Sequence, residues 1–215
     1  MKLLHIEASP RKEASASSRV ADAFVSAYRR LHPDHVVERL ALFEEQLPAF
    51  GAEGADQKTE HVLDLVRGGT GIEATGEWAG VKREVERLAS ADKVLLSSPM
   101  WNFSIPYPLK HYIDLICQPG LTFRVDAQGY VGLVTGKPLQ LVLASGGSYP
   151  AGFPLETHGT ATDFQRPYLE HVARFIGFED IRAIRIERTS ALLPEALEEL
   201  LARRCAEAAE AAAAF

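Results

Sequence analysis

The chain has 215 residues, a formal net charge of −6 at pH 7 and a calculated pI near 5.7. Hydrophobic residues make up 47% and charged residues 24%, which is typical of a globular protein with its own core. The acidic balance provides no basic face, so nucleic acid is excluded as an expected partner. No apolar run approaches the ~20 residues of a membrane-spanning helix, and we expect no membrane association.

The chain has two cysteines, Cys117 and Cys205, which lie far apart in helical patterns. They indicate neither a disulfide framework nor a metal site, and the histidine spacing predicts no metal either. The first twelve residues contain an apolar run too short for a signal peptide and better suited to a first strand. We therefore expect a cytoplasmic protein with reduced thiols, folded as a single domain over residues 1–215.

Short apolar runs alternate with helical periodicity along the chain, which predicts an α/β fold with a parallel sheet. The expected strands are 3–8, 35–42, 92–99, 138–145 and 181–188. The expected helices run from Ser15 or Ser17 to about Leu31 and over 60–66, 77–91, 107–117, 164–178 and 194–214. Segment 120–138 alternates between apolar and turn residues, which predicts a β-hairpin inserted before the fourth strand. Segment 51–78 is a polar excursion with one helix.

Five strands with intervening helices fit a doubly wound, flavodoxin-like sheet of order 2-1-3-4-5. Sheets of this kind bind ligands at the carboxyl ends of their strands. The loops after the first, third and fourth strands are therefore expected to meet at one site.

The loop after the first strand, 9–19, carries Ser9, Ser15, Ser17 and Ser18 where a helix begins. Free backbone N–H groups and the helix dipole favour an anion at such a terminus. The segment lacks the Gly-Lys-Ser/Thr of a Walker loop. The sequence leaves two interpretations of this loop open, a phosphate site and a plain serine N-cap.

The loop after the third strand contains Met100, Trp101, Asn102 and Phe103. Aromatic side chains cover the faces of a flat ring, and a carboxamide donates and accepts hydrogen bonds at its edge. This combination indicates a flavin, although Trp101 and Phe103 are equally well explained as core residues.

The loop after the fourth strand contains Ala144, Ser145, Gly146 and Gly147, followed by Tyr149. Glycine lets the backbone approach a planar ligand, so these N–H groups suit the pyrimidine edge of a flavin. A simple glycine turn is the alternative. Three such loops at one end of one sheet together favour the flavin site.

With these motifs in place, the chain resembles the FMN-dependent NADH-azoreductases of the flavodoxin-like quinone reductase superfamily. The resemblance spans nearly the whole chain, and its long central motif is highly specific. The matching segments are 9–17, PMWNFSIPYPLKHYIDLICQPGLTF at 99–123, 146–147 and 163–181.

The resemblance implies a role for each matching position. The residues implied to bind the FMN phosphate are Ser9, Ser15, Ala16 and Ser17. Those implied to wrap the ribityl chain and ring are Met100, Trp101, Asn102 and Phe103, with Ala144, Ser145, Gly146 and Gly147 at the pyrimidine end. Phe123 matches an aromatic residue that helps to line the substrate cleft of the family's dimers. Tyr149 and His158 resemble the tyrosine and histidine that lie over the flavin in mammalian-type quinone reductases, and a plain surface-loop histidine is the alternative for His158. Family members are homodimers with two sites at the interface.

Three positions depart from the family pattern. Trp101 replaces the usual tyrosine, Ser145 stands where an arginine is common, and Arg188 stands where a glycine usually follows the residue matching Glu187. These departures bear on flavin tuning and substrate preference more than on the identity of the cofactor.

The function implied is a two-electron reductase in which NADH or NADPH reduces FMN and a quinone or azo compound then reoxidises it in the same cleft. One cleft for both substrates predicts ping-pong kinetics, and no catalytic residue is required because the flavin carries the chemistry. Two other functions stay open at this point, a flavodoxin-type electron carrier and an NADPH-dependent FMN reductase. The hairpin at 120–138 and the excursion at 51–78 favour the dimeric enzyme over the carrier.

Overall fold

The computed structural model describes residues 1–149 and 162–215. The central sheet has five parallel strands: β1 (Lys2–Glu7), β2 (Val36–Ala41), β3 (Lys93–Pro99), β6 (Leu139–Ala144) and β7 (Ile181–Ile186). Their spatial order, β2-β1-β3-β6-β7, is the predicted order 2-1-3-4-5 once the two hairpin strands are left out of the count. The helices are α1 (Ala16–Leu31), α2 (Ala52–Val66), α3 (Gly76–Ala89), α4 (Tyr107–Ile116), α5 (Gln165–Ile176) and α6 (Pro194–Ala213).

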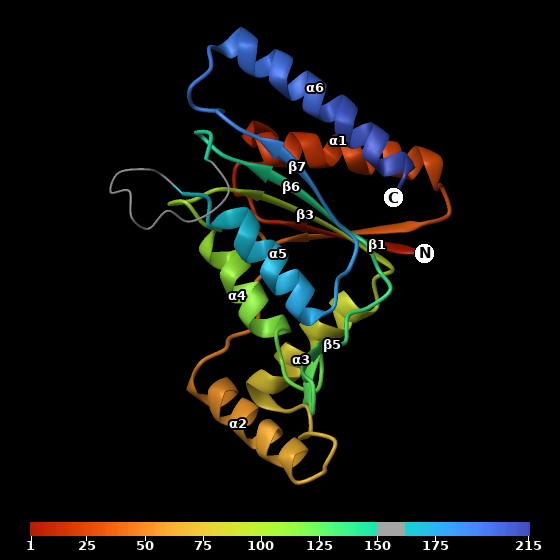
Figure 1. Ribbon diagram of the computed structural model, residues 1–215, viewed down its shortest axis with the longest axis vertical. Coiled ribbons are helices and arrows are strands. Elements are labelled where there is room, and N and C mark those ends of the chain that lie inside the picture. The colour runs from red at the N-terminus through yellow and green to blue at the C-terminus, as the bar shows by residue number, and fades with distance from the viewer. Residues whose placement is uncertain (150–161) are drawn as a thin grey trace.

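Helices cover both faces of the sheet (Figure 1). One face packs against α1 and α6, and the other against α3, α4 and α5, while α2 lies at the end of the molecule farthest from α6. Strand β1 starts beside the N-terminus, so the carboxyl ends of the parallel strands lie on the side away from the two chain ends marked in Figure 1. This is the edge at which the predicted site loops emerge.

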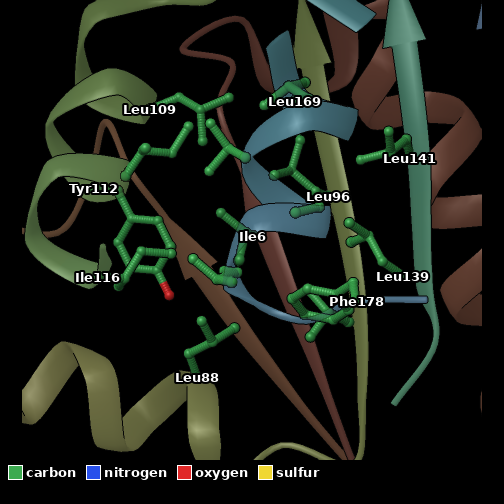
Figure 2. Close-up of a pocket in the computed structure, with 15 residues that line it drawn as sticks. Ile6, Leu88, Leu96, Leu109, Tyr112, Ile116, Leu139, Leu141, Leu169 and Phe178 are labelled. Carbon is green, nitrogen blue, oxygen red and sulfur yellow. The ribbon is translucent and has the colours of Figure 1, made fainter. Parts of the chain in front are cut away.

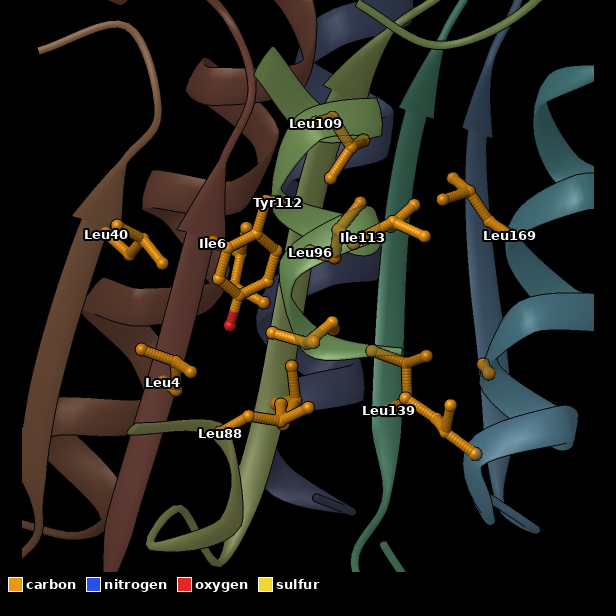
Figure 3. Close-up of a cluster of buried hydrophobic side chains, with 14 of the residues drawn as sticks. Leu4, Ile6, Leu40, Leu88, Leu96, Leu109, Tyr112, Ile113, Leu139 and Leu169 are labelled. Carbon is orange, nitrogen blue, oxygen red and sulfur yellow. The ribbon is translucent and has the colours of Figure 1, made fainter. Parts of the chain in front are cut away.

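The two faces of β1 explain how the core divides. Leu4 and Ile6 belong to the apolar cluster beneath α3, α4 and α5, in which Tyr112 and Leu109 point at the sheet (Figure 3). Leu3 points the other way, into the cluster under α1 and α6. Strands buried on both faces are expected in a parallel sheet covered by helices on both sides.

The predicted hairpin is present as β4 (Phe123–Asp126) and β5 (Gly129–Gly132), which pair antiparallel in a separate two-stranded sheet. It rests on the end of α5, where the N–H of Val134 donates to the carbonyl of Ile176 at 2.8 Å. Gly177 ends α5 with a left-handed φ of 119°, as its position after the helical pattern predicts.

The polar excursion contains more helix than the sequence pattern indicates. The prediction of a helix over 60–66 was too short, because α2 begins at Ala52. The Oε2 atom of Glu77 accepts from the N–H groups of Gly51 and Gly54, at 2.7 and 2.8 Å, and so caps the start of α2. This cap comes from a residue more than twenty positions away, so the local sequence does not reveal it.

Candidate functional site

The loop after β1 becomes a short 3-10 helix, Lys12–Ala14, before α1 begins. Ser15 is the N-cap of α1, and its Oγ accepts from the N–H of Ser18 at 3.4 Å. The first N–H groups of a helix have no acceptor within the helix. Together with the positive end of the helix dipole and the neighbouring hydroxyls, they form an anion-binding terminus.

The loop after β3 is a tight two-residue turn. Trp101 and Ser104 exchange backbone hydrogen bonds of 3.0 and 2.9 Å. Between them, Asn102 and Phe103 have positive φ values of 47° and 69°. Two successive left-handed residues are the signature of a type I′ turn, which asparagine tolerates well and phenylalanine rarely adopts. The turn places strained backbone beside the candidate site.

The loop after β6 is held from its outer side by the segment that follows β7. The carbonyls of Ser145, Gly146 and Gly147 accept from the N–H groups of Thr189, Ser190 and Arg188, respectively, at 3.1–3.2 Å. Within the described part of the chain, the N–H groups of Gly146 and Gly147 have no hydrogen-bond partner. A Cβ on Gly146 would lie 2.8 Å from the Ser190 hydroxyl, so a side chain there would collide with its neighbour.

These loops enclose a cavity of about 320 Å³ at the carboxyl ends of β1, β3 and β6. Its lining includes Arg11 and Arg19, and no carboxylate among the described residues lines it. Hydroxyl-bearing side chains contribute most of its remaining polar groups: Ser9, Ser15, Ser145, Thr189 and Ser190. A cavity lined by two arginines, hydroxyl-bearing side chains and a helix N-terminus suits a phosphate ester.

The cavity gathers eight of the twelve residues expected to bind the cofactor: Ser9, Ser15, Ala16, Met100, Trp101, Ala144, Ser145 and Gly146. Ser17 is fully buried behind it, with its hydroxyl 3.1 Å from that of Ser15. Asn102 and Phe103 are exposed at the tip of their turn, and Gly147 lies just beyond the lining. The structure therefore brings both ends of the predicted site together and leaves these four residues around its edge.

The expected substrate residues occupy different places. Phe123 lies in the hairpin, where its ring packs 4.5 Å from that of Phe175, and it does not line the cavity. Tyr149 meets the ring of Phe103 edge-on at 5.9 Å, beside the turn at 101–104. His158 lies outside the described residues.

Several lining residues were missed from the sequence: Arg11, Arg19, Thr189, Ser190, Leu197 and Leu201. Leu197 and Leu201 come from α6, whose contact with the cavity depends on how that helix packs. Thr189 and Ser190 follow the fifth predicted strand directly. Their position at another carboxyl end of the sheet was a usable signal, because every such loop opens on the same edge.

An ion pair joins α1 and α6 at the wall of the cavity. Arg19 donates to both carboxylate oxygens of Glu198, at 2.8 and 2.7 Å. These hydrogen bonds raise the pKa of Arg19 and lower the pKa of Glu198, so both groups are charged at neutral pH. The pair fixes the position of one of the two cations in the lining.

A second hollow lies inside the core and has a different character. It is a void of about 40 Å³, lined by aliphatic side chains, Phe178 and the ring of Tyr112 (Figure 2). The Tyr112 hydroxyl has no hydrogen-bond partner there, and burial raises its pKa. Apart from Tyr112, every residue that lines this void is apolar, so the void does not suit a polar ligand.

No group of three or more histidine, cysteine, aspartate or glutamate side chains in 1–149 and 162–215 is arranged to hold a metal ion. Over the same residues, none of the helices combines the length and the apolar character that crossing a membrane requires.

Comparison with known proteins agrees with this geometry. Residues 1–211 match the family described as "Flavodoxin-like fold". A protein of Nitratidesulfovibrio vulgaris named "FMN-dependent NADH:quinone oxidoreductase" is 49% identical over 197 residues, covering 90% of this chain and 89% of that one. A protein of the same name from Desulfotalea psychrophila is 43% identical over 189 residues, covering 87% and 85% of the two chains.

Solved structures give the same result. An azoreductase from Bacillus anthracis strain Sterne superposes over 100% of both chains, with a TM-score of 0.83 and 29% identity. An FMN-dependent NADH-azoreductase from the Ames Ancestor strain, solved in complex with FMN, gives a TM-score of 0.78 at 27% identity over 98% of this chain and 97% of that one. The chain therefore belongs to the flavodoxin-like fold family, among its FMN-dependent NADH:quinone oxidoreductases.

Proposed function

We propose that the protein is an FMN-dependent reductase that transfers two electrons from NADH to quinones and azo compounds. The observation that carries the proposal is that one cavity combines an anion-binding end with an end formed by Met100, Trp101 and Gly146. At the anion-binding end, Ser9, Ser15 and the first N–H groups of α1 would hold the phosphate of FMN. Arg11 supplies positive charge at the same wall, while the charge of Arg19 is balanced by Glu198.

The other end of the cavity fits the isoalloxazine ring. Met100 and Trp101 provide apolar and aromatic surface, while Gly146 keeps the backbone close enough for a direct contact. The N–H groups of Gly146 and Gly147, which have no hydrogen-bond partner among the described residues, are suitable donors to the pyrimidine edge. Such donors stabilise negative charge on a reduced ring, so they favour reduction.

Bound FMN supplies the redox chemistry by accepting a hydride from NADH and passing two electrons to the second substrate. The residues of this chain bind, orient and shield the reactants. An open hollow of about 360 Å³ beside the turn at 101–104 is lined by Ser104, Phe164, Pro167, Tyr168 and His171, and it provides apolar surface for a quinone or azo ring. If nicotinamide and acceptor share this space in turn, the kinetics are ping-pong.

We further propose a homodimer with its sites at the interface. Large apolar side chains near the cavity are exposed, including Phe103 at 45%, Tyr107 at 72% and Trp101 at 36%. Grouped apolar surface of this kind is typical of protein–protein contacts. Phe123 and Tyr149 would then border a cleft completed by the second subunit. The free thiols of Cys117 and Cys205 fit our proposal of a cytoplasmic enzyme.

The decisive experiment titrates the flavin-free protein with FMN and then assays NADH oxidation with menadione and with an azo dye. We expect one FMN per chain and turnover of both acceptors, with parallel double-reciprocal plots. Protein that binds no FMN would contradict the whole proposal. FMN binding without NADH-dependent turnover would indicate an electron carrier instead, and intersecting plots would exclude the ping-pong scheme.

A further inference from the structure

The phosphate end of the cavity is connected to the protein interior by a chain of hydrogen bonds. Ser15 lines the cavity, and its Oγ accepts from the N–H of Ser18. The hydroxyl of Ser18 in turn donates to Oε1 of Glu7 at 2.5 Å. Glu7 is the last residue of β1, so the position of the N-cap serine depends on a carboxylate that has no contact with the cavity.

Glu7 is a buried charge, with only 3% of its surface exposed. Its second oxygen, Oε2, accepts from Nε of Arg39 at 2.7 Å and also contacts the Nη2 group of Arg39. Arg39 lies on the edge strand β2 in register with His5, and therefore on the same face of the sheet as Glu7. A buried carboxylate is tolerated only when a partner compensates its charge, and Arg39 is that partner.

Three other ionisable groups near the pair, His5, Asp22 and Glu44, carry no positive charge that could balance Glu7 in place of Arg39. Burial lowers the pKa of His5 to about 4, so His5 is neutral at neutral pH. Asp22 faces the pair from α1, where burial and then the charge of Glu7 raise the pKa of its carboxyl. Glu44 lies 3.9 Å from Arg39 and is itself paired with Lys12 at 2.9 Å. Arg39 is thus the cation that balances the charge of Glu7 and makes the pair neutral.

We propose that Glu7 and Arg39 form a charge-neutral support for the phosphate of bound FMN, with Glu7 positioning Ser18 and Ser15 and Arg39 cancelling the repulsion that Glu7 would exert. The inference rests on the function proposed above. An uncompensated carboxylate close to a phosphate disfavours binding, because like charges repel strongly where little water screens them. Arg39 is therefore a positioning residue that acts through Glu7.

The test compares FMN with riboflavin, which has the same ring and ribityl chain but no phosphate. Affinities are measured on flavin-free protein by flavin fluorescence. Arg39→Met should weaken FMN binding at least tenfold while riboflavin affinity stays within twofold. The Glu7→Gln/Arg39→Met double variant should return to within about threefold of the original FMN affinity, since glutamine retains an acceptor for the Ser18 hydroxyl without the charge.

A matched control and a second variant complete the design. Arg182 lies on the opposite edge strand and pairs with Asp180 at 2.7 Å, so Arg182→Met should leave both affinities unchanged. If Arg39→Met does not fold, a Glu7→Leu/Arg39→Met variant serves instead. It lacks the acceptor for Ser18 and should bind FMN at least fivefold more weakly than Glu7→Gln/Arg39→Met, with riboflavin unaffected.

The outcomes separate this inference from the proposed function. Unaltered protein that binds neither flavin overturns the proposed function. Unaltered protein that binds FMN, together with an Arg39→Met variant that loses FMN and riboflavin equally or loses neither, overturns the inference alone. Failure of the Glu7→Gln/Arg39→Met variant to recover FMN affinity would also overturn it.

Discussion

The two hollows of this protein differ in what surrounds them. The void beneath the sheet is about 40 Å³ and is enclosed by side chains from β1, β3, β6 and the helices α3, α4 and α5 (Figure 2). The cavity at the carboxyl ends of the strands is about 320 Å³ and is formed by loops, hydroxyls and two arginines. The first is an imperfection in close packing, while the second is built for a polar ligand.

Backbone strain also differs between the surroundings of the two hollows. Every non-glycine residue with positive φ in the described part of the chain lies in a loop at the carboxyl ends of the strands: Lys12, Asn102, Phe103 and Arg188. None of these residues lines the void, and none lines the cavity itself, but each is a close chain neighbour of residues that line the cavity. Conformations that cost stability are thus concentrated in the loops around the cavity, and the apolar core supports them. Altering the void should affect folding, whereas altering the loops should affect flavin binding.

The largest expected effect is on folding, from Leu141→Ala. Leu141 is fully buried, lines the void and belongs to β6. Truncation enlarges an existing void, so we expect the free energy of unfolding to fall by roughly 2–5 kcal/mol. Urea unfolding of the flavin-free protein measures this loss, and Leu133→Ala, at a position 36% exposed, is the control with a cost below about 1 kcal/mol. A Leu141→Ala protein with normal stability but poor FMN affinity would contradict the prediction that altering the void affects folding and not flavin binding.

The second prediction concerns acid and the α1 face of the sheet. His5 is buried there with its Nε2 atom 3.0 Å from the Ser97 hydroxyl, and burial lowers its pKa to about 4. In the unfolded chain the pKa of His5 is near 6.5, so the unfolded chain binds a proton at His5 more tightly than the folded protein does. Neutral His5 therefore makes its full contribution to the free energy of unfolding above about pH 6.5. This contribution, about 3 kcal/mol in total, is lost as the pH falls towards 4.

Urea unfolding between pH 7.5 and pH 4.5 tests this window. The protein should lose stability faster than a His5→Gln variant does, whereas His171→Gln, which alters an exposed residue of α5, should leave the slope unchanged. Equal slopes for the His5→Gln variant and the unaltered protein would contradict the prediction. A dependence of stability on pH that is steeper with His5 present would show that a buried ionisable group within the sheet contributes to the stability of the protein.

The third prediction separates the two roles of Ser15, which caps α1 and lines the cavity. Ser15→Ala should cost about 1 kcal/mol of stability through the lost cap. It should also weaken FMN binding by about tenfold or more, because a hydrogen bond to a charged group contributes about 1.5–3 kcal/mol. Ser26→Ala is the matched control, since Ser26 is exposed within α1 and does not line the cavity. An equal loss of FMN affinity in both variants would contradict a direct role for Ser15.

The sequence allowed the sheet and its order to be predicted because each strand is a short apolar run bounded by turn residues. Ser15 and Gly146 were also predictable, since caps and glycine turns are local features. Arg19 was not, because it reaches the cavity wall through its ion pair with Glu198 of α6. The start of α2 was missed for the same reason, as its cap comes from Glu77. Local chemistry is thus readable from sequence, while contacts between distant segments require the fold.

The smallest expected effect concerns strain near the glycine loop. Arg188 has a φ of 64°, and its N–H donates to the carbonyl of Gly147 at 3.1 Å. A left-handed conformation costs an L-residue about 1–2 kcal/mol, and glycine avoids that cost but loses more backbone entropy on folding. Arg188→Gly should therefore raise stability by about 0.5–1 kcal/mol and leave FMN affinity within twofold.

The urea midpoint is the appropriate measurement, with Arg203→Gly as a control of opposite sign. Arg203 is exposed within α6, where glycine should cost about 1 kcal/mol. A loss of stability in Arg188→Gly similar to that in Arg203→Gly would mean that the arginine side chain outweighs its own backbone strain. A gain in stability in Arg188→Gly would show that the loop after β7 retains a strained residue that folding does not require. The arginine would then be expected to serve the flavin end of the molecule instead of its stability.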